Sequence, residues 1–356
     1  MNQHLSIFTR SFKYWELFLA WVFKYPTRCY HIKQKKKKVV SKTLPEKVVQ
    51  FGRSYRKNRG KKGIICQVTS DPRDVEKVIH ILHEIHAHIK NPILCDWSVA
   101  EVLAKVLAYR NLKQGMKIPI PIQEKEKNCV NIKEHQVEEV FELWNKIQAF
   151  GLQPIDQGGA PILLFRGTDF SLIRQEGRAS ILSDLDPKGP GWTLFKKSKK
   201  TLHEWLTKNR HPARVLGHSL GGVIAAYTLI HEAKWMSRQK HESSYAFNFP
   251  GISQKLLNQW DGLKEKPAFT GFVSRGDLIS KFGSLFGQVY EVSFETPLSP
   301  IQAHEMLLFC KEKGHLHEVD LDKENRCKSR TFYSKLQKQI SSTVYLFFKN
   351  QFFDPT

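Results

Sequence analysis

Residues 214–226 read RVLGHSLGGVIAA, a short apolar run, a serine between glycines, and a second apolar run that can form a helix. The centre fits the pattern Gly-x-Ser-x-Gly, in which a serine stands on a sharp turn between a strand and a helix. Gly217 and Gly221 leave room for a strained backbone, and the helix N-terminus favours negative charge. A glycine-serine pair can also form a plain turn, but this context predicts Ser219 as a nucleophile.

The flanking sequence alternates between short apolar runs and helical patterns. Residues 150–155 and 161–165 flank the turn-forming sequence DQGG and predict a hairpin. Three later apolar runs, 213–216, 245–249 and 269–274, occur singly and are each followed by a glycine or a turn. This order is typical of strand-helix units on a mainly parallel sheet. We therefore expect an α/β fold.

A serine nucleophile needs a base and an orienting acid, and in this type of fold they follow in the order Ser, Asp or Glu, His. Asp277 comes directly after the predicted strand 269–274, although aspartate after glycine is also common in ordinary turns. Three histidines lie downstream. His304 precedes an apolar stretch and is favoured as the base, while His315 and His317 lie in a polar stretch and remain alternatives.

Two groups could bind the oxyanion of an acyl-transfer reaction. One is the backbone N–H of Leu220, the residue after the nucleophile. The other is Thr168, which follows the predicted strand 162–166 and offers both a backbone N–H and a hydroxyl. No metal or other cofactor is needed for this chemistry. The histidine-rich segment 80–88 lacks the spacing of a metal-binding helix, so its side chains are expected to be solvated.

Several motifs over roughly residues 150–310 resemble, in order, those of the class 3 or fungal-type lipases. The matching segments are LFRGTD at 164–169, SDLD at 183–186, GHSLGG at 217–222, FNFPG at 247–251 and VSRGD at 273–277. The resemblance implies an α/β-hydrolase fold, a triad of Ser219, Asp277 and His304, and Thr168 as an oxyanion residue. It also implies a serine esterase that cleaves carboxylic ester bonds of lipids through an acyl-enzyme. A phospholipase, a small-ester esterase, or a non-catalytic membrane or nucleic-acid binding protein on the same scaffold are the alternatives.

The basic residues are concentrated at the N-terminus. The formal net charge is +22, and residues 1–62 contribute 17 basic against two acidic side chains, hence +15 of the total. Together with aromatic residues such as Trp15 and Trp21, this composition predicts an extension that contacts an anionic membrane surface; nucleic acid is a less favoured partner. Most lysine runs are simply solvated tails.

The longest apolar run of this extension, residues 14–23, is too short to span a bilayer, and no signal-peptidase pattern follows it. We expect a soluble or peripheral membrane protein, cytoplasmic rather than secreted. Residues 63–150 are expected to be a helical region that packs on a lipase-like α/β-hydrolase domain at 151–356. Helical periodicity predicts helices within 71–112 and 133–150, with a loop or edge segment at 118–121 between them.

Overall fold

The structure of the protein is a computed structural model. The described residues are 73–123, 130–144, 147–156, 159–167, 189–209, 211–277, 279–281, 283–295, 298, 300–309 and 314–322. The predicted basic extension at 1–62 and Thr168 lie outside these residues.

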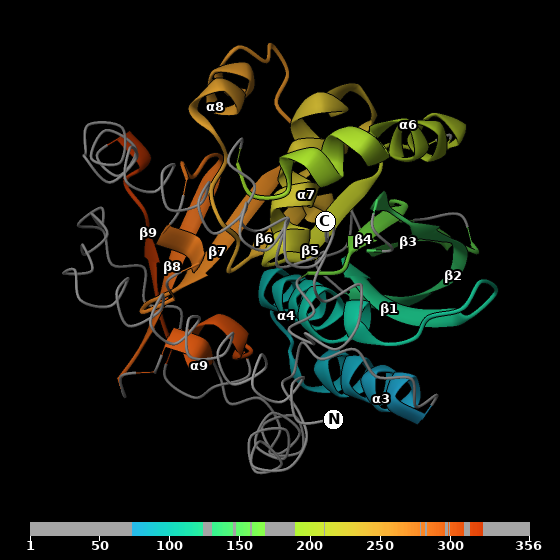
Figure 1. Cartoon of the computed structure of the whole chain (residues 1–356). Helices are drawn as coiled ribbons and strands as arrows, with labels where there is room; N and C mark the ends of the chain where they lie inside the picture. The colour runs from blue at the N-terminus through green and yellow to red at the C-terminus, as the bar shows by residue number, and fades with distance from the viewer. Residues whose placement is uncertain are drawn as a thin grey trace, which may run out of the picture. The chain divides into compact units, whose positions relative to one another are not determined.

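The described strands form one mixed sheet (Figure 1). In spatial order, which is also chain order, they are β1 (Lys117–Gln123), β2 (Val130–Glu142), β3 (Gln148–Pro154), β4 (Ile162–Phe165), β5 (Arg214–His218), β6 (Ser244–Phe247), β7 (Phe269–Ser274), β8 (Gln288–Phe294) and β9 (Gly314–Glu318). The neighbours from β4 to β8 run parallel, while β1 to β4 and the β8–β9 pair are antiparallel. The centre of the sheet is therefore parallel, as predicted.

Helices cover both faces of this sheet (Figure 1). α3 (Arg73–His88) and α4 (Pro92–Lys105) lie on one face, and α6 (Trp192–Lys208), α7 (Leu220–His231) and α8 (Gln254–Asp261) lie on the other. The short helix α9 (Pro300–Glu305) precedes β9. Because the central strands are covered on both sides, every residue of β4, β5, β6 and β7 is buried.

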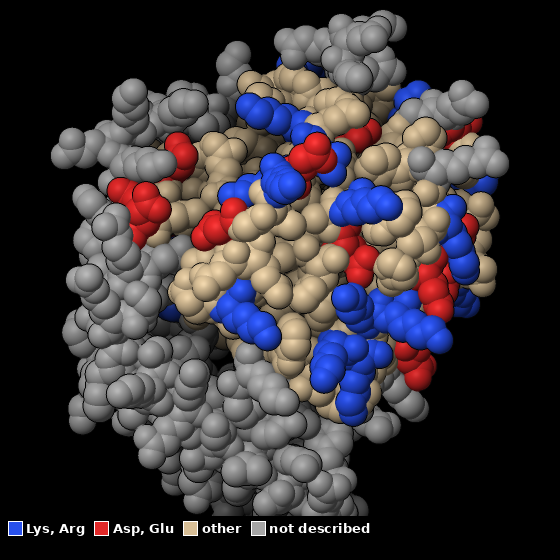
Figure 2. All heavy atoms as spheres, turned by 90° about the horizontal axis from the view of Figure 1, so that it is seen from above, with Lys and Arg blue, Asp and Glu red and all other residues tan. Residues whose placement is uncertain are grey.

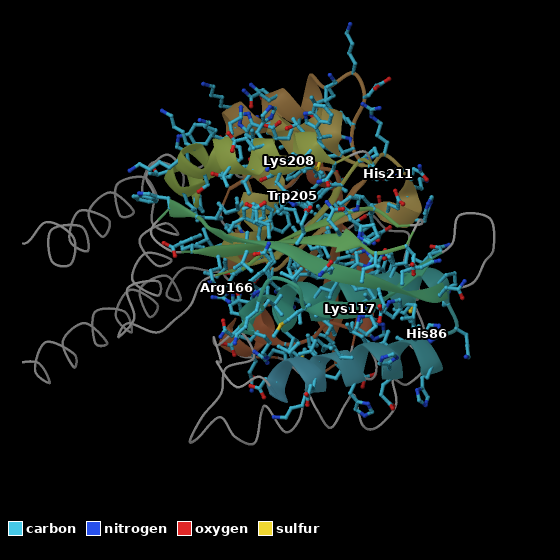
Figure 3. All side chains as sticks on the ribbon, turned by 90° about the vertical axis from the view of Figure 1, so that its right-hand side faces the viewer. His86, Lys117, Arg166, Trp205, Lys208 and His211 are labelled. Atoms are coloured by element: carbon cyan, nitrogen blue, oxygen red, sulfur yellow. The ribbon has the colours of Figure 1, made fainter. Side chains whose placement is uncertain are left out.

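Short 3₁₀ turns complete the connections. They are η2 (Leu107–Tyr109), η4 (Ala233–Trp235), η5 (Lys240–Glu242) and η6 (Ile279–Lys281). The turn η2 is fixed to the end of β4, because the buried Arg166 donates hydrogen bonds to the carbonyls of Ala108 at 2.8 Å and Arg110 at 3.1 Å. On the opposite face, Trp205 of α6 donates to Glu138 at 2.9 Å (Figure 3).

Several expected strands are confirmed. The runs at 213–216, 245–249 and 269–274 correspond to the parallel strands β5, β6 and β7. The hairpin around residues 156–159 is the antiparallel β3–β4 pair. The segment 118–121 lies in β1, the edge strand of the described sheet, where proline costs fewer hydrogen bonds.

The helix predicted over residues 133–150 is wrong, because this segment forms β2 and the start of β3. A bulge between Val137 and Glu139 adds one residue to β2, so that Val137 and Val140, three residues apart, pair with Leu152 and Phe150 and pack against the same core. This spacing imitates a helix. The boundary expected after residue 150 falls inside β3, which pairs with both β2 and β4. Among the described residues before it, the helices are α3, α4 and η2, which precede β1.

None of the helices in the described ranges between residues 73 and 322 has the length and apolar character needed to cross a bilayer.

Candidate active site

Ser219 stands between β5 and α7 in a backbone conformation that residues other than glycine rarely adopt, with φ 56° and ψ −127°. Close backbone packing holds the turn in place. A Cβ atom on Gly217 would lie 2.2 Å from the carbonyl oxygen of Gly221, and one on Gly221 would lie 2.5 Å from the carbonyl oxygen of Phe165. A side chain at position 217 or 221 would collide with backbone atoms, so both positions require glycine, as the pattern Gly-x-Ser-x-Gly predicts.

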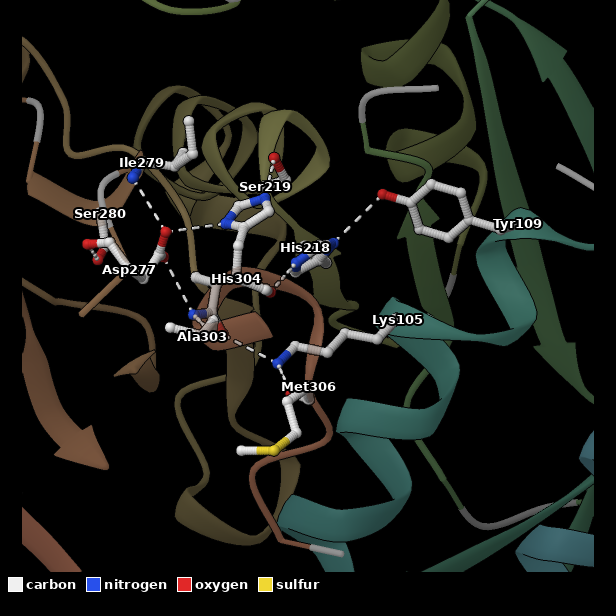
Figure 4. A network of polar contacts seen from close by, with 11 residues as sticks. Lys105, Tyr109, His218, Ser219, Asp277, Ile279, Ser280, Ala303, His304 and Met306 are labelled. Atoms are coloured by element: carbon white, nitrogen blue, oxygen red, sulfur yellow. Dashed lines mark hydrogen bonds and ion pairs between the residues drawn. The ribbon is translucent and has the colours of Figure 1, made fainter. Parts of the chain in front are cut away.

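His304 is the histidine that lies beside this serine (Figure 4). Its Nε2 is 2.9 Å from Ser219 Oγ, and its Nδ1 is 3.0 Å from Asp277 Oδ1. His315 and His317 lie on β9, where His317 contacts Ser293 on β8 at 3.1 Å. The structure thus brings Ser219, Asp277 and His304 together, and it places the two alternative histidines elsewhere.

Asp277 follows the carboxyl end of β7 and is completely buried. Its Oδ1 accepts a hydrogen bond from the Ile279 N–H at 2.9 Å, and its Oδ2 accepts one from Asn248 Nδ2 at 3.0 Å. Burial by itself raises the pKa of this carboxyl group. The charge of His304 and the hydrogen bonds from His304, Asn248 and Ile279 outweigh burial, so the pKa of Asp277 lies below its ordinary value and the group is ionised.

When His304 is neutral and Asp277 is ionised, the one remaining ring proton belongs on Nδ1, which donates to the carboxylate. Nε2 is then an acceptor facing the Ser219 hydroxyl. This tautomer is the one in which the histidine can remove the serine proton. The side chains of Ser219 and His304 are both buried, which strengthens the electrostatic coupling between these groups.

His218, at the end of the strand that precedes the serine, contacts the backbone of His304. Its Nε2 donates to the carbonyl oxygen of His304 at 3.0 Å, and its Nδ1 accepts from the Tyr109 hydroxyl at 3.2 Å (Figure 4). Burial, together with the charges of His304 and Lys105, holds the pKa of His218 well below its ordinary value, so the ring is neutral. Neither His218 nor Tyr109 was predicted from the sequence. The signal for His218 was a polar ring within an otherwise apolar strand.

Asn248 is another residue of the site that was not predicted from the sequence. It follows β6 with a positive φ of 48°, a conformation that asparagine tolerates better than most residues. Its side chain is completely buried and donates both to Asp277 and, at 3.0 Å, to the carbonyl oxygen of Ala303, the residue before His304. One amide group therefore contacts both Asp277 and the segment that carries His304.

Of the two predicted oxyanion groups, Leu220 is described and Thr168 is not. Leu220 is the first residue of α7, where backbone N–H groups have no partner within the helix. The described end of β4 lies against the serine turn, because a Cβ atom on Gly167 would lie 2.4 Å from the carbonyl oxygen of His218. The residue after Gly167 is Thr168, whose role stays a prediction.

No set of three or more His, Cys, Asp or Glu side chains suited to a metal ion occurs in the described part of the chain. In the histidine-rich helix α3, His86 Nε2 lies 2.9 Å from the carbonyl oxygen of Val130.

The face formed by α6, α7 and α8 carries charges of both signs (Figure 2). Lys199 and Lys200 of α6 lie 3.9 Å from the carboxylates of Glu232 and Glu204, respectively. Lys197 lies over the ring of Trp144, 4.3 Å from its centre. These lysines interact with neighbouring side chains of the same chain, so the face is not a patch of one charge.

Neither a protein-family model nor a curated protein sequence matches the chain. Among solved structures it is similar to a fungal lipase at 15% identity and a TM-score of 0.38, over 62% of this chain and 97% of that one. It is also similar to lipase II from Rhizopus niveus, at 17% identity and a TM-score of 0.34, over 50% and 68% of the two chains. A triacylglycerol lipase from Penicillium expansum matches at 14% identity and a TM-score of 0.27, over 64% and 82%.

Proposed function

We propose that the protein is a serine esterase of the α/β-hydrolase type, in which Ser219 is the nucleophile, His304 the base and Asp277 the orienting acid. The observation that carries this proposal is the continuous hydrogen-bonded series from Ser219 Oγ through His304 to Asp277, with distances of 2.9 and 3.0 Å. The strained conformation of Ser219 supports the same role, because strain of this kind concentrates at functional sites.

In the proposed reaction, His304 Nε2 accepts the proton of Ser219 as Oγ forms a bond to the ester carbonyl carbon. The carbonyl oxygen becomes an oxyanion, to which the Leu220 N–H and Thr168 donate. Collapse of this intermediate breaks the bond to the alcohol, which receives the proton from His304. Water then attacks the acyl-enzyme with His304 again as base, and the carboxylic acid leaves while Ser219 regains its proton.

We further propose lipid esters as the substrates. This part rests on the resemblance of the motifs at 164–169, 217–222 and 273–277 to those of the fungal-type lipases. The basic extension at 1–62 would add affinity for an anionic lipid surface, through its lysines and its tryptophans. No metal or cofactor takes part in the proposed steps.

Hydrolysis of p-nitrophenyl esters of increasing acyl length tests the proposal. The full chain is expected to hydrolyse them, with long acyl chains preferred, and Ser219→Ala is expected to lower kcat about 10⁴-fold or more. Ser253→Ala is the matched control, because Ser253 caps α8 and is not among the residues of the proposed site. Equal rates for the full chain and Ser219→Ala would contradict the proposal and would favour a non-catalytic binding protein.

A further inference from the structure

Helix α4 carries two charged side chains that have no exposure to solvent, Glu101 and Lys105. They stand one turn apart, with 2.9 Å between Lys105 Nζ and Glu101 Oε1. Most of the other residues of this helix are also buried. Removing two charges from water is costly, and a well-packed apolar pair of similar size often stabilises a protein as well or better. This pair therefore calls for a role beyond stability.

The contacts of Lys105 lead directly to the proposed triad (Figure 4). Its Nζ donates to Asn248 Oδ1 at 2.9 Å and to the carbonyl oxygen of Met306 at 2.7 Å. An ammonium group can only donate hydrogen bonds, so the amide oxygen of Asn248 must face Lys105. The amide nitrogen then necessarily faces Asp277 and the carbonyl oxygen of Ala303. Lys105 thus determines which end of the amide reaches the acid.

Glu101 extends the same contacts along the chain. Its carboxylate accepts the backbone N–H groups of Leu308 at 2.6 Å and Phe309 at 3.1 Å. Together, Asn248, Lys105 and Glu101 bind backbone groups on both sides of His304, from Ala303 to Phe309. This segment contains little regular structure, since α9 ends at Glu305. The buried charges of α4 therefore fix the part of the chain that carries the base.

We propose that Lys105 and Asn248 are positioning residues of the Asp277–His304 pair. Lys105 orients the amide of Asn248, and the amide holds the carboxylate of Asp277 in the direction that keeps its Oδ1 on His304 Nδ1. Glu101 balances the charge of Lys105. The inference rests on the proposed function of the triad, but the arrangement of the acid and the base can be measured without any reaction.

Two variants separate positioning from folding. Asn248→Asp keeps the size of the side chain and the acceptor for Lys105, but it removes the donors to Asp277 and Ala303. The double variant Glu101→Gln with Lys105→Met removes the orienting ammonium without leaving a buried carboxylate unpaired. Tyr245→Phe is the control, because it removes a different buried hydrogen bond on β6, the 2.5 Å contact with Asp96.

Two measurements are made on each variant. The first is kcat and KM for a p-nitrophenyl ester, per mole of folded protein. Both variants are expected to lower kcat roughly 10- to 100-fold, the effect of losing a hydrogen bond to a charged group, with little change in KM. The second is the low-field proton NMR resonance of His304 Nδ1–H, assigned by its absence from His304→Gln. It is expected to shift or disappear in both variants and to persist in Tyr245→Phe.

The values of kcat and the His304 resonance in the two variants test the positioning role of Lys105 and Asn248. A wild-type resonance and kcat that are retained in folded Asn248→Asp and in the double variant would overturn the positioning role. If the wild type has no Ser219-dependent hydrolysis, the proposed function fails, yet the resonance still tests the positioning. In that case its loss in the two variants supports the inference, and its persistence overturns it.

Discussion

At the scale of single residues, the site depends on a serine whose backbone has a positive φ. Such a conformation costs on the order of 1–3 kcal/mol, which the surrounding structure must offset. Ser219 is held by its N–H, which donates to the carbonyl of Phe247 at 3.0 Å, and by the two glycines that allow α7 and the end of β4 to approach the turn. Ser219 is therefore placed by backbone packing, and the glycines cannot be exchanged freely.

Gly221→Ala should be destabilising and inactive. The new methyl group would lie 2.5 Å from the carbonyl oxygen of Phe165, a backbone atom that cannot move without shifting β4. We expect a loss of about 1–3 kcal/mol in the free energy of unfolding, measured in urea, and loss of ester hydrolysis. Gly262→Ala is the matched control, since its methyl group would lie no closer than 3.4 Å to another atom. Wild-type stability and activity in Gly221→Ala would contradict the packing at the turn.

The choice of base leads to a second prediction. His304→Ala should lower kcat about 10⁴-fold or more, because without a base the Ser219 hydroxyl is a weak nucleophile. His315→Ala and His317→Ala should retain activity, since both side chains lie on β9 and neither contacts Ser219. Steady-state kinetics on the three variants distinguish these cases. A larger loss in either β9 variant than in His304→Ala would identify a different base.

At the scale of elements, α4 is joined to the sheet by a buried group of polar side chains. Arg214 of β5 lies 3.1 Å from Asp96 of α4, and the hydroxyl of Tyr245 donates to the same carboxylate. Burial by itself lowers the pKa of Arg214, but the charge and hydrogen bond of Asp96, together with the effects of Tyr245 and Glu242, outweigh it and the pKa is raised. The guanidinium of Arg214 remains charged within the core, so its burial depends on the opposite charge of Asp96.

Asp96→Ala should therefore cost about 3–5 kcal/mol in the free energy of unfolding, because it leaves the buried Arg214 without a counter-charge. The double variant Asp96→Leu with Arg214→Met removes both charges and should recover most of this loss. Urea denaturation of the two variants measures the difference. If Asp96→Ala were as stable as the wild type, or the double variant less stable than Asp96→Ala, the dependence of buried Arg214 on the charge of Asp96 would be contradicted.

How far the sequence predicts the structure differs between elements. The central strands are predictable because each is a short apolar run buried on both sides, and the hairpin at 156–159 is marked by its glycines. The segment 133–150 was predicted to be a helix because the bulge after Val137 brings Val137 and Val140, three residues apart, to one face of the strand, as a helix would. Ser219, Asp277 and His304 can be selected by chain order, whereas Asn248 and Lys105 cannot, because their contacts join positions 143 residues apart.

At the scale of the whole molecule, buried histidines make the stability depend on pH. Burial lowers the pKa of His135 from 6.5 to about 4, although hydrogen bonds to backbone groups oppose the shift. The pKa of His218 is lowered for the same principal reason. Between these values and 6.5 the unfolded chain binds protons that the folded chain does not, so stability must fall as the pH decreases.

For His135 alone, the shift from 6.5 to about 4 predicts a loss of about 2 kcal/mol in the free energy of unfolding between pH 7 and pH 5. Urea denaturation of the wild type and of His135→Gln at both pH values tests this. The variant should lose about 2 kcal/mol less than the wild type over the interval, because glutamine does not titrate. The same pH dependence in both proteins would contradict the burial of a neutral His135.

The basic extension gives a prediction for the complete chain. Sedimentation with anionic vesicles should be strong for the full chain and lost on deletion of residues 1–62, which contribute +15 of the net charge. Neutral vesicles are the control, and added salt should weaken the binding. Unchanged sedimentation after the deletion would reject the extension as the membrane contact.

Ser219 is proposed to be a nucleophile that His304 activates. The most direct test of this activation is labelling with a fluorophosphonate, which reacts covalently with activated serines, followed by peptide mass spectrometry. We predict a single adduct on Ser219 in the wild type, an adduct of equal yield in His315→Ala and His317→Ala, and none in His304→Ala. An unlabelled Ser219 in the folded wild type, or equal labelling in His304→Ala, would contradict the claim.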